Sequence, residues 1–129
     1  MKNQTIITAS VFGMLAVIAG AFGAHGLRAY LAPQNLEVWH TAVQYQFYHV
    51  FALLFLSTFI NKNNKLTIAA YYLFAVGIVF FSGSLYLLSC RDLLGWGWLI
   101  AVGPVTPLGG LFFIIGWLVL GLAAFKNNK

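Results

Sequence analysis

The chain has 129 residues, of which 61% are apolar and 7% are charged. Soluble domains carry about a quarter charged residues, so this composition excludes a water-soluble globular fold. The net charge of +5 comes from basic residues scattered singly along the chain, which excludes the continuous basic surface that nucleic-acid binding needs. The single cysteine, Cys90, excludes an intramolecular disulfide and a cysteine-based metal site.

The first apolar segment, about residues 6–24, predicts a membrane-crossing helix. It carries no charge, and about 19 residues are enough to cross a hydrocarbon core of about 30 Å. Its start at Lys2 and its small residues also resemble a signal peptide, but the apolar stretch is longer than a signal core. We therefore expect a helix that stays in the chain.

The stretch from His25 to Glu37 predicts a loop on the far side of the membrane. Leu27, Tyr30 and Leu31 recur at helical spacing, so a short interfacial helix is expected there. Pro33 is expected to end it, and Asn35 to cap the next crossing helix.

The second crossing helix, about residues 38–60, is unusually polar in its first half and ordinary apolar sequence in its second half. The loop that follows is short and polar, so it predicts an antiparallel hairpin into the third helix, about residues 66–89. The polar positions of the first half are His40, Gln44, Tyr45, Gln46, Tyr48 and His49.

The apolar stretch Leu93–Val102 is about 10 residues long, too short to cross alone. It predicts an interfacial or partly re-entrant piece, anchored by Trp96 and Trp98 at the level of the headgroups. If it crossed instead, the chain would have five crossings and its C-terminus would change sides. The sequence leaves open whether residues 93–105 are interfacial, re-entrant or part of the fourth helix.

The fourth crossing helix is expected over residues 107–125. The Gly103–Pro104 pair interrupts the chain before it. Thr106 followed by Pro107 is typical of an N-cap and a proline at the first helical position. The fold class is therefore an all-α membrane protein, one domain over residues 1–129, built as an antiparallel bundle of four crossing helices.

Basic residues predict the orientation of this bundle, because they gather on the cytoplasmic side. Four crossings put both termini and the loop at residues 61–65 on one side. That side carries five lysines, and the other carries two arginines beside two carboxylates. We expect both termini in the cytoplasm and a bacterial plasma (inner) membrane location. The lysines are Lys2, Lys62, Lys65, Lys126 and Lys129.

Polar side chains gather in the outer half of the predicted bundle. At about 1.5 Å per residue, Gln44 lies roughly 9 Å and His49 roughly 16 Å below the start of the second helix. Polar groups at that depth are expected to face protein or water, which makes the second helix the central one. The candidate pocket comprises His25, His40, Gln44, Gln46, His49, Ser82, Ser84, Tyr86, Thr106 and Trp117.

Small residues at regular spacing predict close contacts between helix backbones, the main packing device in lipid. The first helix has them three and four residues apart, and the third and fourth have pairs seven apart. They are Ala16, Gly20, Gly23, Ala24 and Gly26, then Gly77 with Ser84, and Gly109 with Gly116. A tight bundle without a wide pore is expected.

His49 admits two interpretations. It can serve as a haem or metal ligand or a proton relay, or it can be a neutral histidine hydrogen-bonded inside the bundle, to Trp117 or Gln46. We favour the second, because one buried imidazole is not a ligand set. His25 and His40 can meet at the mouth, but only Glu37 or Asp92 is available as a third ligand. No metal and no cofactor is therefore expected.

Two rim ion pairs are expected at the outer surface, Arg28–Glu37 and Arg91–Asp92, either as weak surface pairs or as a site for a lipid phosphate or a partner. No catalytic signature occurs, neither a nucleophile elbow nor a zinc-protease, phosphate-loop or paired-cysteine motif. An enzyme is therefore not expected.

Five motifs carry a resemblance to a known family. GAFGAHGLR (residues 20–28), TAVQYQFYH (41–49), FSGSLY (81–86), TPLGG (106–110) and GW (116–117) occur in the order seen in that family. The chain resembles the YgdD/YwdK family of small bacterial inner-membrane proteins, whose animal relatives are called transmembrane protein 256. The resemblance covers nearly the whole chain and implies a four-helix membrane protein, and it implies no activity.

Three functions remain open at this point. The leading hypothesis is a non-enzymatic accessory or structural subunit that packs against itself or a larger membrane complex. The second is a membrane protein that binds or transports a lipid, quinone or small solute in the polar pocket. The third is redox or haem chemistry through His49.

Overall fold

The computed structural model describes residues 1–61 and 63–127, and this part of the chain is helical and contains no strand. Lys62 and Lys129, two of the lysines on which the expected orientation depends, lie outside it. The elements are α1 (Lys2–Ala21), the π-helix η1 (Phe22–Gly26), α2 (Pro33–Ser57), α3 (Lys65–Ser89), α4 (Arg91–Leu94), the 3-10 helix η2 (Gly97–Val102) and α5 (Val105–Asn127).

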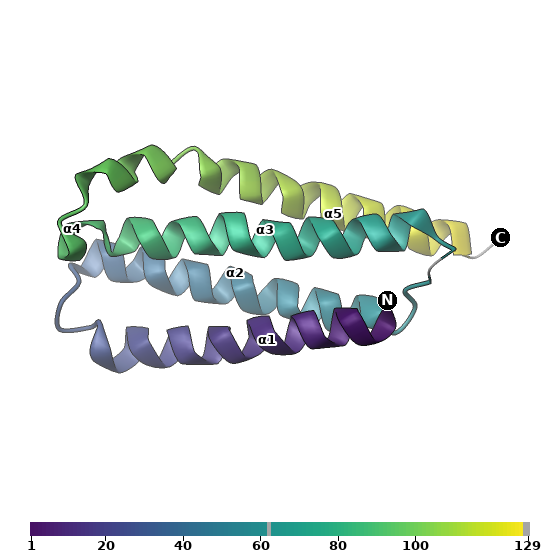
Figure 1. Cartoon of the computed structure of the whole chain (residues 1–129), viewed down its shortest axis with the longest axis horizontal. Coiled ribbons are helices and arrows are strands. Elements are labelled where there is room, and N and C mark those ends of the chain that lie inside the picture. The colour runs from purple at the N-terminus through teal and green to yellow at the C-terminus, as the bar shows by residue number, and fades with distance from the viewer. Residues whose placement is uncertain (62, 128–129) are drawn as a thin grey trace.

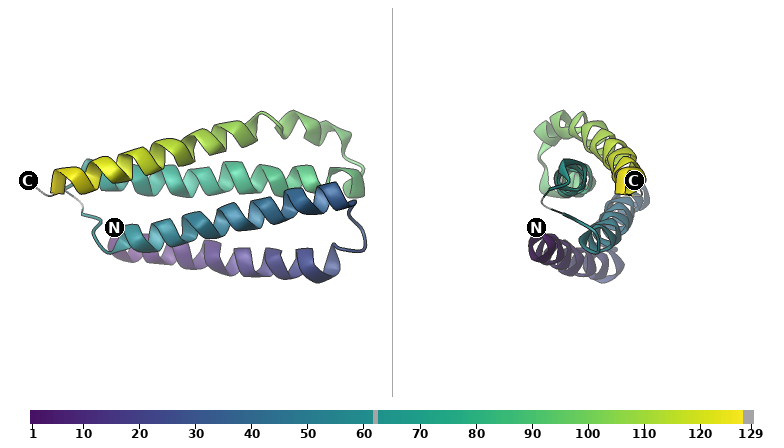
Figure 2. Two further views of the ribbon diagram at one scale, coloured as in Figure 1. Left: turned by 180° about the vertical axis from the view of Figure 1, so that it is seen from behind. Right: turned by 90° about the vertical axis from the view of Figure 1, so that its right-hand side faces the viewer.

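The four long helices run in alternating directions and pack in chain order, α1 on α2, α2 on α3 and α3 on α5. The start of α1, the end of α5 and the facing ends of α2 and α3 lie at one end of the molecule, and α4 and the α1–α2 connection lie at the other (Figure 1). The view along the helices shows a folded row rather than a ring around one helix (Figure 2). The prediction that α2 is surrounded by the other three is correct only in part, because α5 packs along α3 and reaches α2 through the side chains of Phe113 and Trp117.

The close contact between α3 and α5 explains this arrangement. A Cβ atom on Gly109 would lie 2.7 Å from the Cα of Phe81, so only a glycine lets the two backbones come this near. Gly116 faces the ring of Phe74 in the same way, and Gly77 on α3 faces the ring of Phe113. The pairs of small residues seven apart thus form the α3–α5 interface, as the sequence predicts.

The small residues of α1 face α2. Ala16 is fully buried, Gly20 lies against Val43, and Gly23 lies under the indole of Trp39. Ala24 and Gly26, which belong to the same predicted ridge, are exposed instead. The reason is the π-helical turn over Phe22–Gly26, which rotates the end of the segment away from the ridge.

The second helix starts earlier than predicted. Pro33 occupies its first turn and Ala32 is its N-cap, so Pro33 begins α2 instead of ending an interfacial helix, and Asn35 does not cap it. Proline suits this position because the first N–H groups of a helix have no partner within it. The predicted interfacial helix is replaced by turns over residues 27–32.

The stretch before α5 divides into two short helices. Gly95 ends α4 in the left-handed conformation with φ of 67°, which favours glycine. The six-residue η2 that follows is far too short to cross a membrane alone, and it leads almost directly into α5. Trp96 and Trp98 are exposed beside each other, with ring centroids 6.0 Å apart. Leu99, in contrast, is buried.

Three helical segments of the described chain are long and apolar enough to cross a membrane, Lys2–Gly26, Lys65–Ser89 and Gly97–Lys126. The α2 helix has 25 residues, as many as α3, but its polar outer half lowers its hydropathy. The all-α fold is thereby confirmed, with three candidate membrane-crossing helices and α2 as the more polar long helix.

A matched pair of glycine substitutions on α5 tests the α3–α5 contact. Gly109→Ala forces the helices apart and is expected to lower the free energy of unfolding by about 1–3 kcal/mol. A Cβ on Gly121 meets no atom within 4 Å, so Gly121→Ala is expected to be neutral or to stabilise the helix by up to about 1 kcal/mol. Unfolding by sodium dodecyl sulfate in mixed micelles measures both. Equal effects would contradict the interface.

Candidate functional site

The polar residues of α2 fall into two sets. Gln46 and His49 are buried between helices, whereas His40, Gln44 and Tyr48 are exposed on the opposite face. A helix packed on two sides offers burial to only part of its circumference, which produces this division. The candidate site is therefore built from the buried set and its partners on α1, α3 and α5.

Gln46 joins three helices. Its Nε2 donates to the backbone oxygen of Phe12 on α1, at 2.7 Å. Its Oε1 accepts a hydrogen bond from the hydroxyl of Tyr86 on α3, also at 2.7 Å. Both ends of the amide are thus satisfied within the protein, which a buried amide requires in hydrocarbon.

Trp39 extends this group toward the outer end of the molecule. Its Nε1 donates to the backbone oxygen of Ala19 at 2.8 Å, and its ring lies 4.6 Å from that of Tyr86 between centroids. A Cβ on Gly23 would lie 2.7 Å from the indole, so glycine makes room for the contact. Sequence reasoning assigned no role to Trp39, although Gly23 within the motif at residues 20–28 was the available signal.

His49 is held from both nitrogens. Its Nδ1 lies 2.7 Å from the backbone oxygen of Tyr45, and its Nε2 lies 3.2 Å from Nε1 of Trp117. A carbonyl only accepts and an indole only donates, so the partners select the neutral form with the hydrogen on Nδ1. The expected hydrogen bond to Trp117 is present, and Gln46 bonds elsewhere.

The ring of Phe113 covers one face of His49. The two ring centroids are 3.4 Å apart and the planes differ by 4°. Sequence reasoning missed Phe113, because nothing in an apolar stretch distinguishes one phenylalanine from another. With both nitrogens paired and a face covered, His49 has no lone pair free for a metal or haem in this conformation.

The hydroxyl groups of the predicted pocket are also paired within the chain. Ser82 donates to the backbone oxygen of Ala42 at 2.7 Å and so joins α3 to α2. Ser84 and Thr106 share a hydrogen bond of 2.5 Å between α3 and α5. The prediction of Thr106 as the N-cap and Pro107 as the first helical residue is wrong, because α5 begins at Val105 and Thr106 lies inside its first turn, where it binds across the interface.

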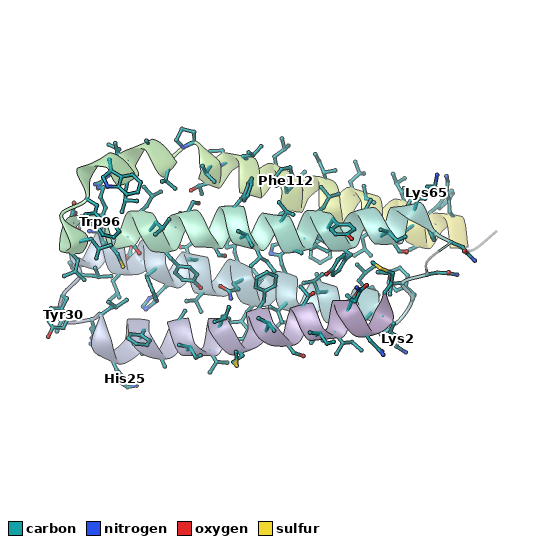
Figure 3. The ribbon with its side chains drawn as sticks, viewed as in Figure 1. Lys2, His25, Tyr30, Lys65, Trp96 and Phe112 are labelled. Carbon is teal, nitrogen blue, oxygen red and sulfur yellow. The ribbon has the colours of Figure 1, made fainter. Side chains whose placement is uncertain are left out.

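The predicted single pocket is not formed. His25 lies at the outer end and points away from the helices (Figure 3). His40 and Gln44 are exposed, and the buried members form separate hydrogen-bonded pairs. In the described chain, every buried side-chain nitrogen and oxygen has a hydrogen-bond partner.

Two apolar grooves occur instead. One, of about 540 Å³, lies between α1 and α3, with Gln46 and Tyr86 in its wall. The other, of about 530 Å³, lies between α2 and α5 and includes His49 and Trp117. Both grooves are lined mainly by apolar and aromatic side chains and contain few polar groups.

The outer rim holds one of the two expected ion pairs. Arg91 Nε lies 3.5 Å from Asp92 Oδ1, and Asn35 donates to the other oxygen of Asp92 at 3.1 Å. Arg28 and Glu37 make no such contact within residues 1–61 and 63–127. The same part of the chain holds no group of three or more His, Cys, Asp or Glu residues that could bind a metal ion.

Comparison with known proteins gives the family. A model described as "Protein of unknown function (DUF423)" matches residues 19–110. The chain is 44% identical over 124 residues to the UPF0382 membrane protein YwdK of Bacillus subtilis, covering 94% of this chain and 95% of that one. It is 33% identical over 131 residues to a UPF0382 membrane protein of Haemophilus influenzae, covering 100% and 99%. No solved structure matches.

The fold and the paired interior define a small helical membrane protein whose polar groups join its helices. The chain belongs to the DUF423 family, whose matched members carry the name UPF0382 membrane protein, and the resemblance seen in the sequence is confirmed. The names of the matched family and relatives give no biochemical activity, as the resemblance in the sequence implies.

Trp117→Phe tests the pairing of His49. The change keeps an aromatic ring but removes the N–H donor, so Nε2 loses its partner and the free energy of unfolding is expected to fall by about 1 kcal/mol. Trp98→Phe is the matched control, because Trp98 is 66% exposed. Titration with sodium dodecyl sulfate compares the two, and an equal loss would show that the His49 contact contributes nothing specific.

Proposed function

We propose that the protein crosses a bacterial inner membrane four times with both termini in the cytoplasm. The packing of α2 along α1 and α3 supports its crossing, in spite of its polar half. Lys2 and Lys65 lie at one end of the molecule, and Trp96 and Tyr30 lie at the other (Figure 3). Lysine at the cytoplasmic end fits the positive-inside rule.

A cysteine placed at Gly95 in a Cys90→Ser chain is therefore expected to react with an impermeant maleimide added outside intact cells.

Within that membrane, we propose a structural or accessory role without catalysis. The observation that carries this is that each buried side-chain nitrogen and oxygen in the described part of the chain has a hydrogen-bond partner. Gln46 and Ser82 bond to neighbouring helices, and Trp117 of α5 donates to His49. A catalytic or transport site instead needs polar groups directed at a substrate. Polar groups that are already paired hold helices in register.

The size of the protein in mild detergent extracts of its own membranes tests this role. An accessory or structural subunit is expected to migrate as a species larger than the 14.2 kDa chain with its detergent. Extraction in sodium dodecyl sulfate, which separates subunits, provides the matched control. A bare monomer under every mild condition would contradict the role.

A second candidate function, binding of a long-chain lipid or quinone, is favoured by the α1–α3 groove. Its walls are apolar, with Phe12, Ile18 and Ile78 among them, and the Gln46–Tyr86 pair and Trp39 lie beside them. An apolar cleft with a few polar groups is typical of sites for such molecules. Any polar end of the ligand would approach Tyr86, whose hydroxyl oxygen retains capacity to accept a hydrogen bond.

Gly83 allows a clean test of the groove. It borders the groove, and a Cβ there meets no atom within 4 Å, so the side chain of Gly83→Leu starts in open space and extends beside the groove. The groove function predicts that this variant folds normally but retains several-fold less lipid or quinone in native mass spectrometry. Gly121→Leu on the lipid-exposed side of α5 is the control. Equal retention would contradict the candidate function.

A further inference from the structure

One face of α2 is a continuous exposed stripe, which we call the α2 stripe. Its members recur three or four residues apart and lie within about 80° of one another at 100° per residue. Trp39 and Gln46 point to α1, Ala42 faces α3, and His49 faces α5. The stripe lies on the opposite face of α2, with Tyr48 at the edge of the α2–α5 groove. The α2 stripe consists of Glu37, His40, Gln44, Tyr48, Phe51 and Phe55.

The polar members of the α2 stripe have no partner in the described chain. The side chains of His40 and Gln44 and the hydroxyl of Tyr48 form no hydrogen bond among residues 1–61 and 63–127, in contrast to the paired Gln46. An amide facing hydrocarbon without a partner is costly, since the bilayer core offers no hydrogen bonds. The stripe therefore differs from the apolar outer faces of α1, α3 and α5.

The side chain of Gln44 is exposed at a level that lies within the hydrocarbon core of a bilayer. The hydrogen bond from Ser82 to Ala42 fixes the level of α2 against α3. By that register Gln44 lies opposite residue 80, about 5 Å along the axis from the middle of Lys65–Ser89. A hydrocarbon core of about 30 Å extends about 15 Å from its middle, so Gln44 lies well inside it.

We propose that the α2 stripe is the contact surface for a second copy of this chain. Two copies inserted in the same orientation are related by a two-fold axis along the membrane normal, which brings identical residues together at equal depth. The amide of Gln44 carries both donor and acceptor and so completes its own symmetric copy. The hydroxyl of Tyr48 has the same property. This proposal names the partner in the structural role proposed above and rests on that role.

The outer and inner ends of the stripe fit the same partner. Glu37 and His40 lie three residues apart at the outer end, so the carboxylate of one copy lies about 4.5 Å along the axis from the imidazole of the other and can reach it diagonally across a parallel contact. Phe51 and Phe55 are 61% and 60% exposed at the inner end and supply apolar surface. Residues spaced three and four apart suit the shallow crossing of two parallel helices in lipid.

Disulfide trapping in native membranes tests the proposal with the full chain in a Cys90→Ser background. Phe51→Cys places a thiol on the stripe and leaves its polar residues intact. Leu118→Cys on α5 is the control, because Leu118 is 62% exposed, lies at nearly the same depth and does not line the groove that contains Tyr48. Oxidation with copper phenanthroline is expected to give a band at twice the chain mass for Phe51→Cys and none for Leu118→Cys.

A second measurement tests the part played by Gln44. Dilution of labelled chains in lipid, read by energy transfer, is expected to show about tenfold weaker association for Gln44→Leu. Gln34→Leu is the matched control, since Gln34 lies in the first turn of the same helix, outside the stripe. It is expected to leave association unchanged, and equal association of both variants with the parent chain would overturn the role of Gln44.

The possible trapping results separate this proposal from the structural role on which it rests. Dimers through Leu118→Cys alone would overturn the α2 stripe as the contact surface. An adduct of Phe51→Cys with a different protein, without dimer, would overturn the second copy as partner but leave the structural role standing. No adduct at either position, together with a monomer in mild detergent, would overturn both.

Discussion

A polar side chain carried into hydrocarbon needs a hydrogen-bond partner, and this constraint organises the structure. The α2 helix carries more such groups than a crossing helix usually does. Gln46 finds its hydrogen-bond partners in the backbone of α1 and the hydroxyl of Tyr86 on α3. His49 satisfies it through its own helix and Trp117 of α5. The polarity that makes α2 a poor membrane helix alone thereby makes it the helix that joins the others.

Small residues bring neighbouring helix backbones close enough for hydrogen bonds to form between them. Gly109 lets α5 reach the backbone of α3 at Phe81, and the same approach brings Thr106 to Ser84. Gly23 lets Trp39 reach the backbone of α1 in an equivalent way. Backbone proximity and buried polar pairs therefore depend on each other, because short side chains such as serine and threonine bond across helices only at close range.

The sequence predicts the helices and their packing ridges better than the site. Length and hydropathy predict the long helices. The spacing of small residues predicts the packing ridges that carry Gly77 and Gly109. Both are local properties of one segment. The start of α2 was mispredicted because proline both ends and begins helices. The pocket was mispredicted because depth along a helix says nothing of its rotation: Gln44 and Gln46 lie at similar depth, yet one is exposed and the other buried. Partners such as Trp39 and Phe113 belong to other helices and needed the tertiary structure.

The interior of the protein and the α2 stripe represent two outcomes of the same constraint. Inside, the polar groups are paired within one chain, which supports a structural rather than a catalytic role. On the stripe they remain without a partner in the described chain, and the proposed second copy would satisfy them. The matched family model and the matched relatives carry names that assign no reaction.

The central claim is that Gln46 and Tyr86 act together to join α2 to α3, and a double-mutant cycle tests it most directly. Gln46→Leu, Tyr86→Phe and the double variant are each unfolded with sodium dodecyl sulfate in mixed micelles. The account predicts non-additive losses, with a coupling energy of about 0.6–1.7 kcal/mol, the range of hydrogen bonds between membrane helices. Strictly additive losses would contradict it.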